Sequence, residues 1–226
     1  MTTFTSSEPV AALFLDVAQT LLGKPGLMPA IGAVLTRFGH RVKLPELALR
    51  HRLLCEATTF PDHTTRDFYQ TFNTRLLHAL AIRPHADLLD AMFAACRGLP
   101  WSPFADVAHL QGIRLPIGIL SNWDLGLRAQ LSTQLPWLAP RWLLGSAECG
   151  LRKPDPGFFQ RATEASGLSP ETIAYVGDSP ALDIAPALAL GWRAMLIDRE
   201  DFYPHADCPR IRDFSELSAR LALRPD

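Results

Sequence analysis

The chain has 226 residues, of which 48% are hydrophobic, and its formal net charge is −1. This length is enough for one large domain, or for one domain that carries an insertion. A charge so close to zero offers no basic excess for a nucleic-acid partner. No block of like charges is present that would be typical of an interaction tail.

The N-terminal region and the cysteines indicate the compartment. The first ten residues contain no basic cluster, and the apolar run that follows, residues 11–15, ends at Asp16. That run is too short for a signal-peptide core or a membrane span. The four cysteines are far apart and form no CxxC pair, which favours free thiols in a reducing compartment. We therefore expect a cytoplasmic protein with no membrane association.

Short apolar runs that end in polar or glycine-containing turns predict the strands of a central sheet. They are Ala11–Leu15, Pro116–Leu120, Trp142–Leu144, Ile173–Val176 and Ala194–Ile197. Helical patterns follow several of them, at Asp124–Gln134, Pro156–Ser166, Ala181–Leu190 and Phe214–Leu223. Asp155 can cap the helix that Pro156 opens, and Gly167 can end it. Continuous apolar strands that alternate with helices predict an α/β fold with a Rossmann-like, doubly wound parallel sheet.

The region between the first strand and the next has a different pattern. From Gly23 to Leu99 it is mostly helical and contains no convincing strand. The expected helices are Ala30–Gly39, Pro45–Ala57, Thr65–Ala81 and His85–Arg97. We predict a helical cap domain of residues 23–99, inserted into an α/β core of residues 1–22 and 100–226. Open α/β sheets bind ligands at the carboxyl ends of their strands, so a cap inserted after the first strand is expected to cover that edge.

Polar residues gather where the predicted strands end. They are Asp16, Ser121-Asn122, Lys153, and Gly177-Asp178-Ser179 with Asp183 five residues after Asp178. Each alone has an ordinary explanation, as a helix cap, a turn or a solvated lysine. Together they are the groups that phosphoryl transfer needs. A carboxylate attacks phosphorus, a lysine and a divalent cation neutralise the phosphoryl oxygens, and short polar donors hold the remaining oxygen.

In this order the four clusters resemble the four motifs of the haloacid dehalogenase (HAD) superfamily, with a helical cap of the C1 type after the first motif. The resemblance spans residues 11–197. It is carried above all by GILSNWD, ECGLRKPDPGFF and AYVGDSPALDIAPALALGW. It implies a hydrolase, and more narrowly a Mg²⁺-dependent phosphatase of a small phosphorylated metabolite. Such a protein is expected to act as a monomer or homodimer without nucleic acid or membrane.

The resemblance also implies a role for each site residue. Asp16 would form an aspartyl-phosphate, and Mg²⁺ would be held by Asp16, Asp178 and the backbone carbonyl of Ala18. Asp183 would orient Lys153 or a metal-bound water. The residues expected to bind the substrate are Thr20, Ser121, Asn122 and Lys153.

The first motif departs from the phosphatase pattern DxDGT. Ala18 stands in place of the second Asp, which protonates the leaving group and later activates water, and Gln19 stands in place of Gly. General acid–base catalysis is typically worth about 10²–10⁴ in rate. The Gln19 amide can position a water but cannot act as an acid. The chain thus resembles a subgroup without the second Asp. From the missing acid and base we expect aryl or acyl phosphate substrates and a long-lived aspartyl-phosphate.

Three other functions remain open at this stage. Haloacid dehalogenases of the superfamily also lack the second Asp, but they work without metal and carry Ser/Asn in place of Gly177-Asp178. Phosphonate hydrolases need a cap lysine for a Schiff base, for which Lys43 is the candidate, and usually have Arg in place of Lys153. The last of these three is a binding or regulatory protein that keeps the fold and the metal site but little catalysis.

Overall fold

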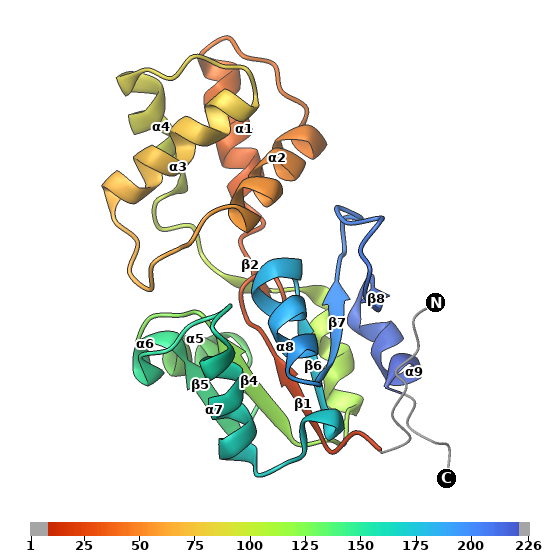
Figure 1. Cartoon of the computed structure of the whole chain (residues 1–226). Helices are drawn as coiled ribbons and strands as arrows, with labels where there is room; N and C mark the ends of the chain where they lie inside the picture. The colour runs from red at the N-terminus through yellow and green to blue at the C-terminus, as the bar shows by residue number, and fades with distance from the viewer. Residues whose placement is uncertain (1–8, 222–226) are drawn as a thin grey trace. The chain divides into compact units, whose positions relative to one another are not determined.

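The chain divides into two compact units in the computed structural model, which describes residues 9–221 (Figure 1). One unit comprises residues 1–23 and 103–226 and is called the α/β unit here. The other, residues 24–102, is called the helical unit. No helix among the described residues is both long and apolar enough to cross a membrane.

The α/β unit is built on a six-stranded, all-parallel sheet in the order β5-β4-β1-β6-β7-β8. The strands are β1 Ala12–Leu15, β4 Ile117–Ser121, β5 Trp142–Gly145, β6 Ile173–Gly177, β7 Arg193–Ile197 and β8 Arg210–Ile211. The five expected strands are confirmed, and β8 was missed because two residues are too few to show a pattern. Two further strands of two residues each, β2 (Leu22–Gly23) and β3 (Ser102–Pro103), pair with each other in a separate sheet.

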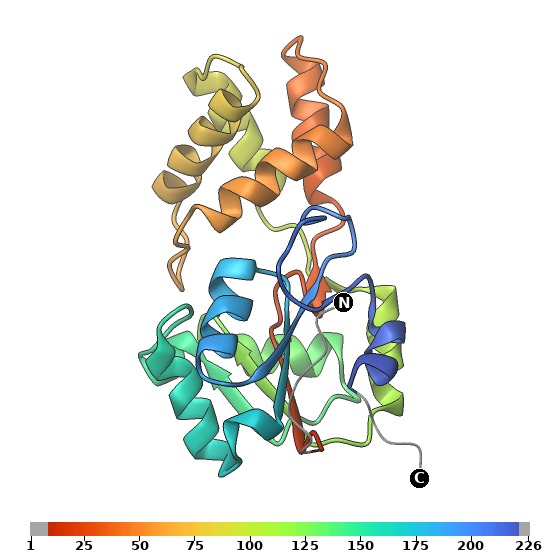
Figure 2. The ribbon, with the colours of Figure 1, turned by 45° about the vertical axis from the view of Figure 1, so that its right-hand side comes forward.

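Helices cover both faces of this sheet. On one face α7 (Pro156–Ser166) and α8 (Ala185–Ala189) bury Phe158, Phe159 and Ala187 against Phe14 and other strand residues. The connections from β1 to β4 and from β4 to β5 run across the sheet in the other direction. Since crossovers between parallel strands are right-handed, these two connections lie on the opposite face. That face carries η1 Ala105–Gly112 and α5 Leu127–Gln134. The segment η4 Phe214–Glu216 packs beside η1, and α9 Leu217–Arg220 packs beside η4. Figures 1 and 2 show the two layers, and the expected doubly wound α/β fold is confirmed.

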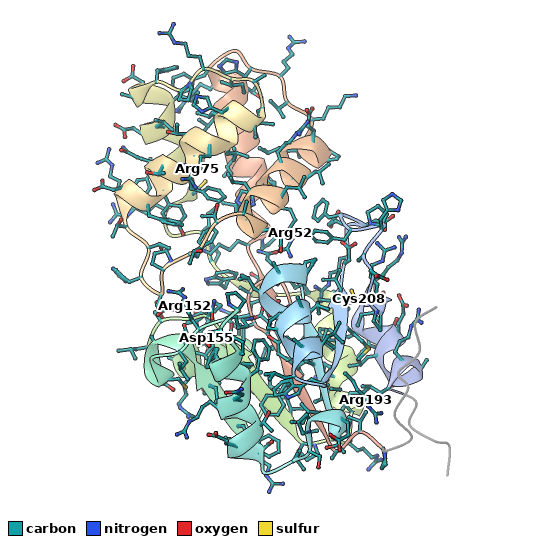
Figure 3. All side chains as sticks on the ribbon, in the orientation of Figure 1. Arg52, Arg75, Arg152, Asp155, Arg193 and Cys208 are labelled. Carbon is teal, nitrogen blue, oxygen red and sulfur yellow. The ribbon has the colours of Figure 1, made fainter. Side chains whose placement is uncertain are left out.

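Local signals set the ends of these helices. Asp155, labelled in Figure 3, accepts a hydrogen bond from the Gly157 N–H (2.8 Å), and Gly167 ends α7 with φ of 68°. The expected helix from Asp124 begins only at Leu127, because the Asp124 carboxylate accepts from the Gly126 N–H and closes a turn. The short helical segments α6 Ser146–Cys149, η2 Pro170–Thr172 and the π-helical turn η3 Pro180–Ile184 complete the unit. The expected end of the last helix, Leu223, lies outside the described residues.

The helical unit contains the four helices expected from the sequence. They are α1 Leu27–Arg37, α2 Leu44–Glu56, α3 Arg66–Ala79 and α4 Ala86–Cys96. Their apolar faces form a core of their own that includes Ile31, Leu35, Leu47, Leu76, Leu77, Leu88 and Met92. Thr65 and His85 cap α3 and α4 by accepting hydrogen bonds from the N–H groups of Phe68 and Leu88.

One histidine of the helical unit is held in an environment that disfavours its charge. The ring of His51 on α2 packs edge-on against Phe72 at 5.2 Å, and its Nδ1 lies 3.6 Å from the Cys55 sulfur. Burial, reinforced by the neighbouring Arg52 cation, lowers the pKa of His51 from 6.5 to about 4. His51 is therefore a neutral packing residue at neutral pH.

This environment predicts a stability that depends on pH. Because the pKa of His51 is lower in the folded than in the unfolded state, unfolding takes up a proton between pH 6.5 and about 4. Stability should fall by about 1–3 kcal/mol as pH drops through that window. Urea denaturation at pH 7 and pH 5 should show that His51→Gln removes this loss. The exposed His63 serves as the control, and His63→Gln should keep the wild-type pH dependence. An unchanged pH dependence in His51→Gln would contradict the assignment.

Candidate active site

The first carboxylate of the site lies one residue beyond β1. Both of its oxygens are engaged: Asp16 Oδ1 accepts from Ser121 Oγ at 2.8 Å and from Lys153 Nζ at 2.6 Å, and Asp16 Oδ2 lies 3.3 Å from Thr20 Oγ1. All four side chains are buried. The structure therefore brings together four predicted site residues that are spread over 138 positions of the chain, from 16 to 153.

The sheet explains why these side chains meet. β1 pairs in parallel with both β4 and β6, so the carboxyl ends of the three strands lie at one edge. Asp16 directly follows β1, Ser121 ends β4, and Asp178 directly follows β6. At β4, Gly118 has no side chain because an added Cβ would lie 2.4 Å from the ring of Phe14. Glycine at this position therefore leaves room for the Phe14 ring of the neighbouring strand.

Lys153 holds two carboxylates at once. Its Nζ donates to Asp16 Oδ1 and, at 2.5 Å, to Asp183 Oδ1, and its side chain is 3% exposed. Burial alone would lower the pKa of Lys153, but the charges of Asp16 and Asp183 outweigh it and hold the pKa above its ordinary value. Lys153 is therefore a permanent ammonium between two acidic groups.

Tyr175 on β6 completes the contacts of Lys153 and is a site residue that was not predicted from the sequence. Its hydroxyl donates to Asp183 Oδ1 (2.8 Å), accepts from Lys153 Nζ (3.2 Å), and lies 3.2 Å from the Leu120 carbonyl oxygen. Burial, together with the charges of the nearby carboxylates, raises the pKa of Tyr175, so the phenol stays protonated. The Tyr175 ring packs against Phe159. In the sequence, a tyrosine within an apolar strand indicates only this packing role.

Asp183 occupies space that a glycine leaves open. Its Oδ2 accepts from the Ser179 N–H at 3.0 Å. A Cβ built on Gly177 would lie 2.4 Å from the Asp183 carboxyl carbon, so only glycine fits before Asp178. The Gly-Asp pair that the sequence placed at the end of β6 thus has two separate functions. The glycine makes room for Asp183, and the aspartate adds a further carboxylate to the edge.

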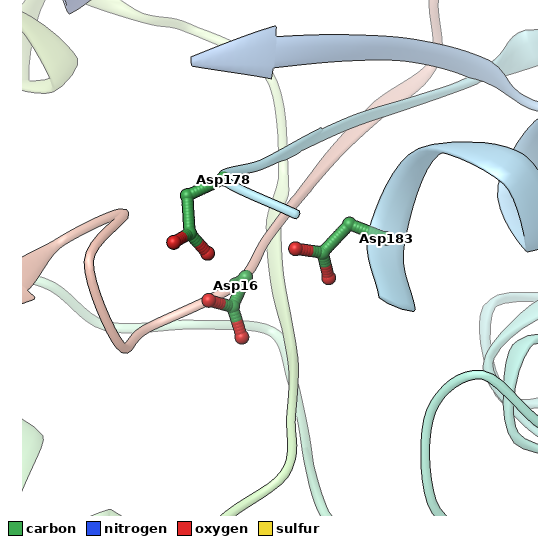
Figure 4. A group of neighbouring side chains, drawn as sticks. All are labelled: Asp16, Asp178 and Asp183. Carbon is green, nitrogen blue, oxygen red and sulfur yellow. The ribbon is translucent and has the colours of Figure 1, made fainter. Parts of the chain in front are cut away.

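Three carboxylates converge at this edge, as Figure 4 shows for Asp16, Asp178 and Asp183. One oxygen from each lies within 4.8 Å of the others, and Asp16 and Asp183 are buried. Burial and the charge of Asp183 raise the pKa of Asp16, although Lys153 opposes them. Three carboxylates beside one ammonium leave an excess of negative charge. A hard divalent cation bound by oxygen ligands would balance this excess.

Asn122 contacts the site indirectly. Its side-chain oxygen accepts from the Lys153 N–H (2.8 Å), and its amide nitrogen donates to the Lys153 carbonyl (3.0 Å). Both polar atoms of the side chain therefore hold the backbone of Lys153. In the structure the Asn122 side chain supports Lys153. Its expected role in substrate binding stays a prediction.

Comparison with known proteins agrees with this architecture. The model of a family described as HAD-hydrolase-like matches residues 150–211. A solved L-2-haloacid dehalogenase superposes with a TM-score of 0.68 at 20% identity, covering 95% of this chain and 99% of that one. YfnB from Bacillus subtilis, described as a HAD-hydrolase bound to magnesium, superposes with a TM-score of 0.64 at 19% identity and covers 96% and 100% of the two chains. Residues 150–211 thus match the HAD-hydrolase-like family, the described chain has the fold of these solved structures, and the expected resemblance is confirmed.

Similarity to curated proteins is more limited in extent. The phosphoserine phosphatase of Thermus thermophilus is 34% identical over 145 residues, which cover 61% of this chain and 57% of that protein. The chain spans between 37% and 57% of the length of the curated relatives it matches. The placement of the chain in a subgroup without the second Asp stays a prediction.

The ion network predicts a large effect of removing Lys153. Lys153→Met should destabilise the α/β unit by about 3–5 kcal/mol, because the loss of one partner leaves buried carboxylates uncompensated. Adding Asp16→Asn and Asp183→Asn should recover more than half of this loss. Urea denaturation followed by circular dichroism in metal-free buffer measures both effects. The exposed pair Arg161–Glu164 provides the control, and Arg161→Met should change stability by less than about 0.5 kcal/mol. Equal losses in the single and triple variants would show that Lys153 does not act through these charges.

Proposed function

We propose that the protein is a Mg²⁺-dependent phosphatase of a small phosphorylated metabolite, acting through an aspartyl-phosphate at Asp16. The observation that carries the proposal is the excess of carboxylates around the nucleophile. Asp178 and Asp183 each place an oxygen within 4.8 Å of Asp16, and Lys153 supplies a single compensating charge. This arrangement suits a site that binds a cation and then a phosphoryl group.

The site residues fit a two-step displacement. A carboxylate oxygen of Asp16 attacks phosphorus, the bond from phosphorus to the leaving oxygen breaks, and the enzyme carries an acyl phosphate. Water then attacks this phosphate and releases the free Asp16 carboxylate. Ser121 and Lys153, which contact Asp16 Oδ1, are placed to donate hydrogen bonds to the transferred group. Asp183 and Tyr175 hold the ammonium of Lys153 in place.

The metal would be held by Asp16, Asp178 and the Ala18 carbonyl. When bound, Mg²⁺ supplies charge neutralisation for the phosphoryl oxygens. Support for a metal comes from the acidic cluster itself and from the magnesium that YfnB binds. The similarity to the phosphoserine phosphatase of Thermus thermophilus supports phosphoryl transfer as the reaction.

Ala18 determines which substrates suit the site. Its methyl group cannot protonate a leaving alkoxide or activate a water, so the leaving group must depart with little help. Aryl and acyl phosphates meet this condition, because their leaving groups are weak bases. For the same reason hydrolysis of the aspartyl-phosphate is expected to be slow, and the phosphoenzyme should accumulate during turnover.

A panel of aryl, acyl and sugar phosphates tests the proposed function. Turnover should require Mg²⁺, disappear in chelator, and fall at least about 10³-fold in Asp16→Asn, because the amide is not a nucleophile. Asp124→Asn is the matched control. Asp124 lies three residues after Ser121 and only caps a turn, which asparagine also does, so this variant should keep wild-type activity. Absence of turnover on every phosphate would overturn the proposal, and halide release from a 2-haloacid in chelator would then identify a dehalogenase.

Restoring the missing carboxylate tests the interpretation of Ala18. Ala18→Asp should raise the rate on sugar phosphates by about 10²-fold or more and have much less effect on aryl phosphates, because only poor leaving groups need a proton. Gln19→Gly restores the other substituted residue of the motif without adding an acid, so it should leave the ratio of the two rates unchanged. Steady-state kinetics across leaving groups of graded basicity measures this ratio. An equal change for both substrate classes in Ala18→Asp would show that Ala18 does not limit proton transfer.

A further inference from the structure

The loop that follows β1, residues 16–22, has a conformation that its own sequence disfavours. Gln19 has φ of 60°, in the left-handed region that residues with a side chain rarely adopt. This region is normal for glycine, which has no Cβ. Contacts with the rest of the fold must therefore hold Gln19 in this conformation.

Bonds within the loop fix only one side of Gln19. The Gln19 N–H donates to the Leu22 carbonyl at 2.7 Å, and the Val17 carbonyl accepts from Leu21 and Leu22 at 2.9 Å. The peptide that joins Ala18 to Gln19 is planar and trans, so its carbonyl points opposite to its N–H. The direction of the Ala18 carbonyl is consequently fixed as long as the Gln19 N–H keeps its hydrogen bond to the Leu22 carbonyl. None of these bonds uses the Ala18 carbonyl itself.

Arg199, two residues beyond β7, holds the other side of Gln19. Its Nη1 donates to the Gln19 carbonyl at 3.0 Å, and its Nη2 donates to the Thr20 carbonyl at 2.9 Å. The guanidinium is itself held by a two-bond contact with Asp106, from Nε at 3.0 Å and from Nη2 at 2.8 Å. It also lies 4.0 Å from the ring centroid of Phe104. With Arg199 in place, both peptide planes around Gln19 are fixed.

We propose that Arg199 is a positioning residue that holds residues 18–20 so that the Ala18 carbonyl and the Thr20 hydroxyl face Asp16. A purely structural role, linking Asp106 on η1 to the end of β7, would need the carboxylate contact but not the two carbonyl contacts. This inference rests on the proposed function, since the metal-ligand role of Ala18 comes from it. The planar fork of the arginine matters, because it reaches the carboxylate and both carbonyls at once.

The test measures metal binding and loop protection without substrate. Calorimetry gives the Kd for Mg²⁺, and amide hydrogen exchange reports on Gln19 and Leu22. In Arg199→Met the Kd should rise roughly 10- to 100-fold, as is typical when a group that orients metal ligands is removed. Exchange at the two amides should accelerate at least about 10-fold, because Gln19 is no longer fixed on both sides. Arg199→Lys should fall between wild type and Arg199→Met, since one ammonium cannot make all of these bonds.

Arg210 provides the matched control. It pairs with Asp198 (2.9 Å) and Asp201 (2.6 Å) in the same segment after β7, and these contacts do not involve residues 16–22. Arg210→Met should change the Kd by less than about twofold and leave exchange at Gln19 and Leu22 unchanged. A wild-type Kd in Arg199→Met would overturn the inference. If the wild-type protein binds no Mg²⁺, the proposed function fails. Amide exchange still decides the role of Arg199 in that case, since unchanged protection in Arg199→Met would overturn it.

Discussion

The buried ammonium of Lys153 is the interaction on which the rest of the α/β unit depends. It joins Asp16, from the first strand of the chain, to Asp183, from the turn after the fourth of the long strands. Neither carboxylate could remain ionised in this environment without a cation, because transferring a lone charge from water into the interior costs far more than one hydrogen bond returns. Asn122 fixes the backbone of Lys153, and the Tyr175 hydroxyl accepts the third hydrogen bond of the Lys153 ammonium. The ammonium therefore sets the mutual position of three strand ends.

Much of this arrangement was predicted from the sequence, because a parallel sheet places the residues that follow its strands at one edge. An apolar strand that ends in a polar residue places that residue at a known edge, which is how Asp16, Ser121 and Asp178 were selected. The five long strands and the four helices of the helical unit were predicted for the same reason, since each has a clear periodic pattern. The strand β8, the 3-10 helix η1 and the four-residue helix α6 were missed, because segments of this kind are held by the contacts around them more than by a pattern of their own.

The missed site residues share a different property. Tyr175 looks like a packing residue because its ring is buried, and only the position of its hydroxyl beside Asp183 reveals a polar function. Arg199 acts on backbone carbonyls about 180 positions earlier in the chain, and carbonyls carry no sequence signal. The conformation of Gln19 is hidden in the same way, because the residue itself favours another one. Contacts between a side chain and a distant backbone have to be read from the folded chain.

The central place of β1 also has a consequence for how the protein is made. Its two neighbours in the sheet, β4 and β6, lie more than 100 and 150 positions further along the chain, so β1 leaves the ribosome long before either partner exists. The helical unit is one continuous segment and can form its core first. Until translation passes residue 177, at least one of the two partner strands of the apolar segment Ala12–Leu15 has not been made. An apolar strand that waits this long for its neighbours is exposed to aggregation during synthesis, and the strand order is what causes the wait.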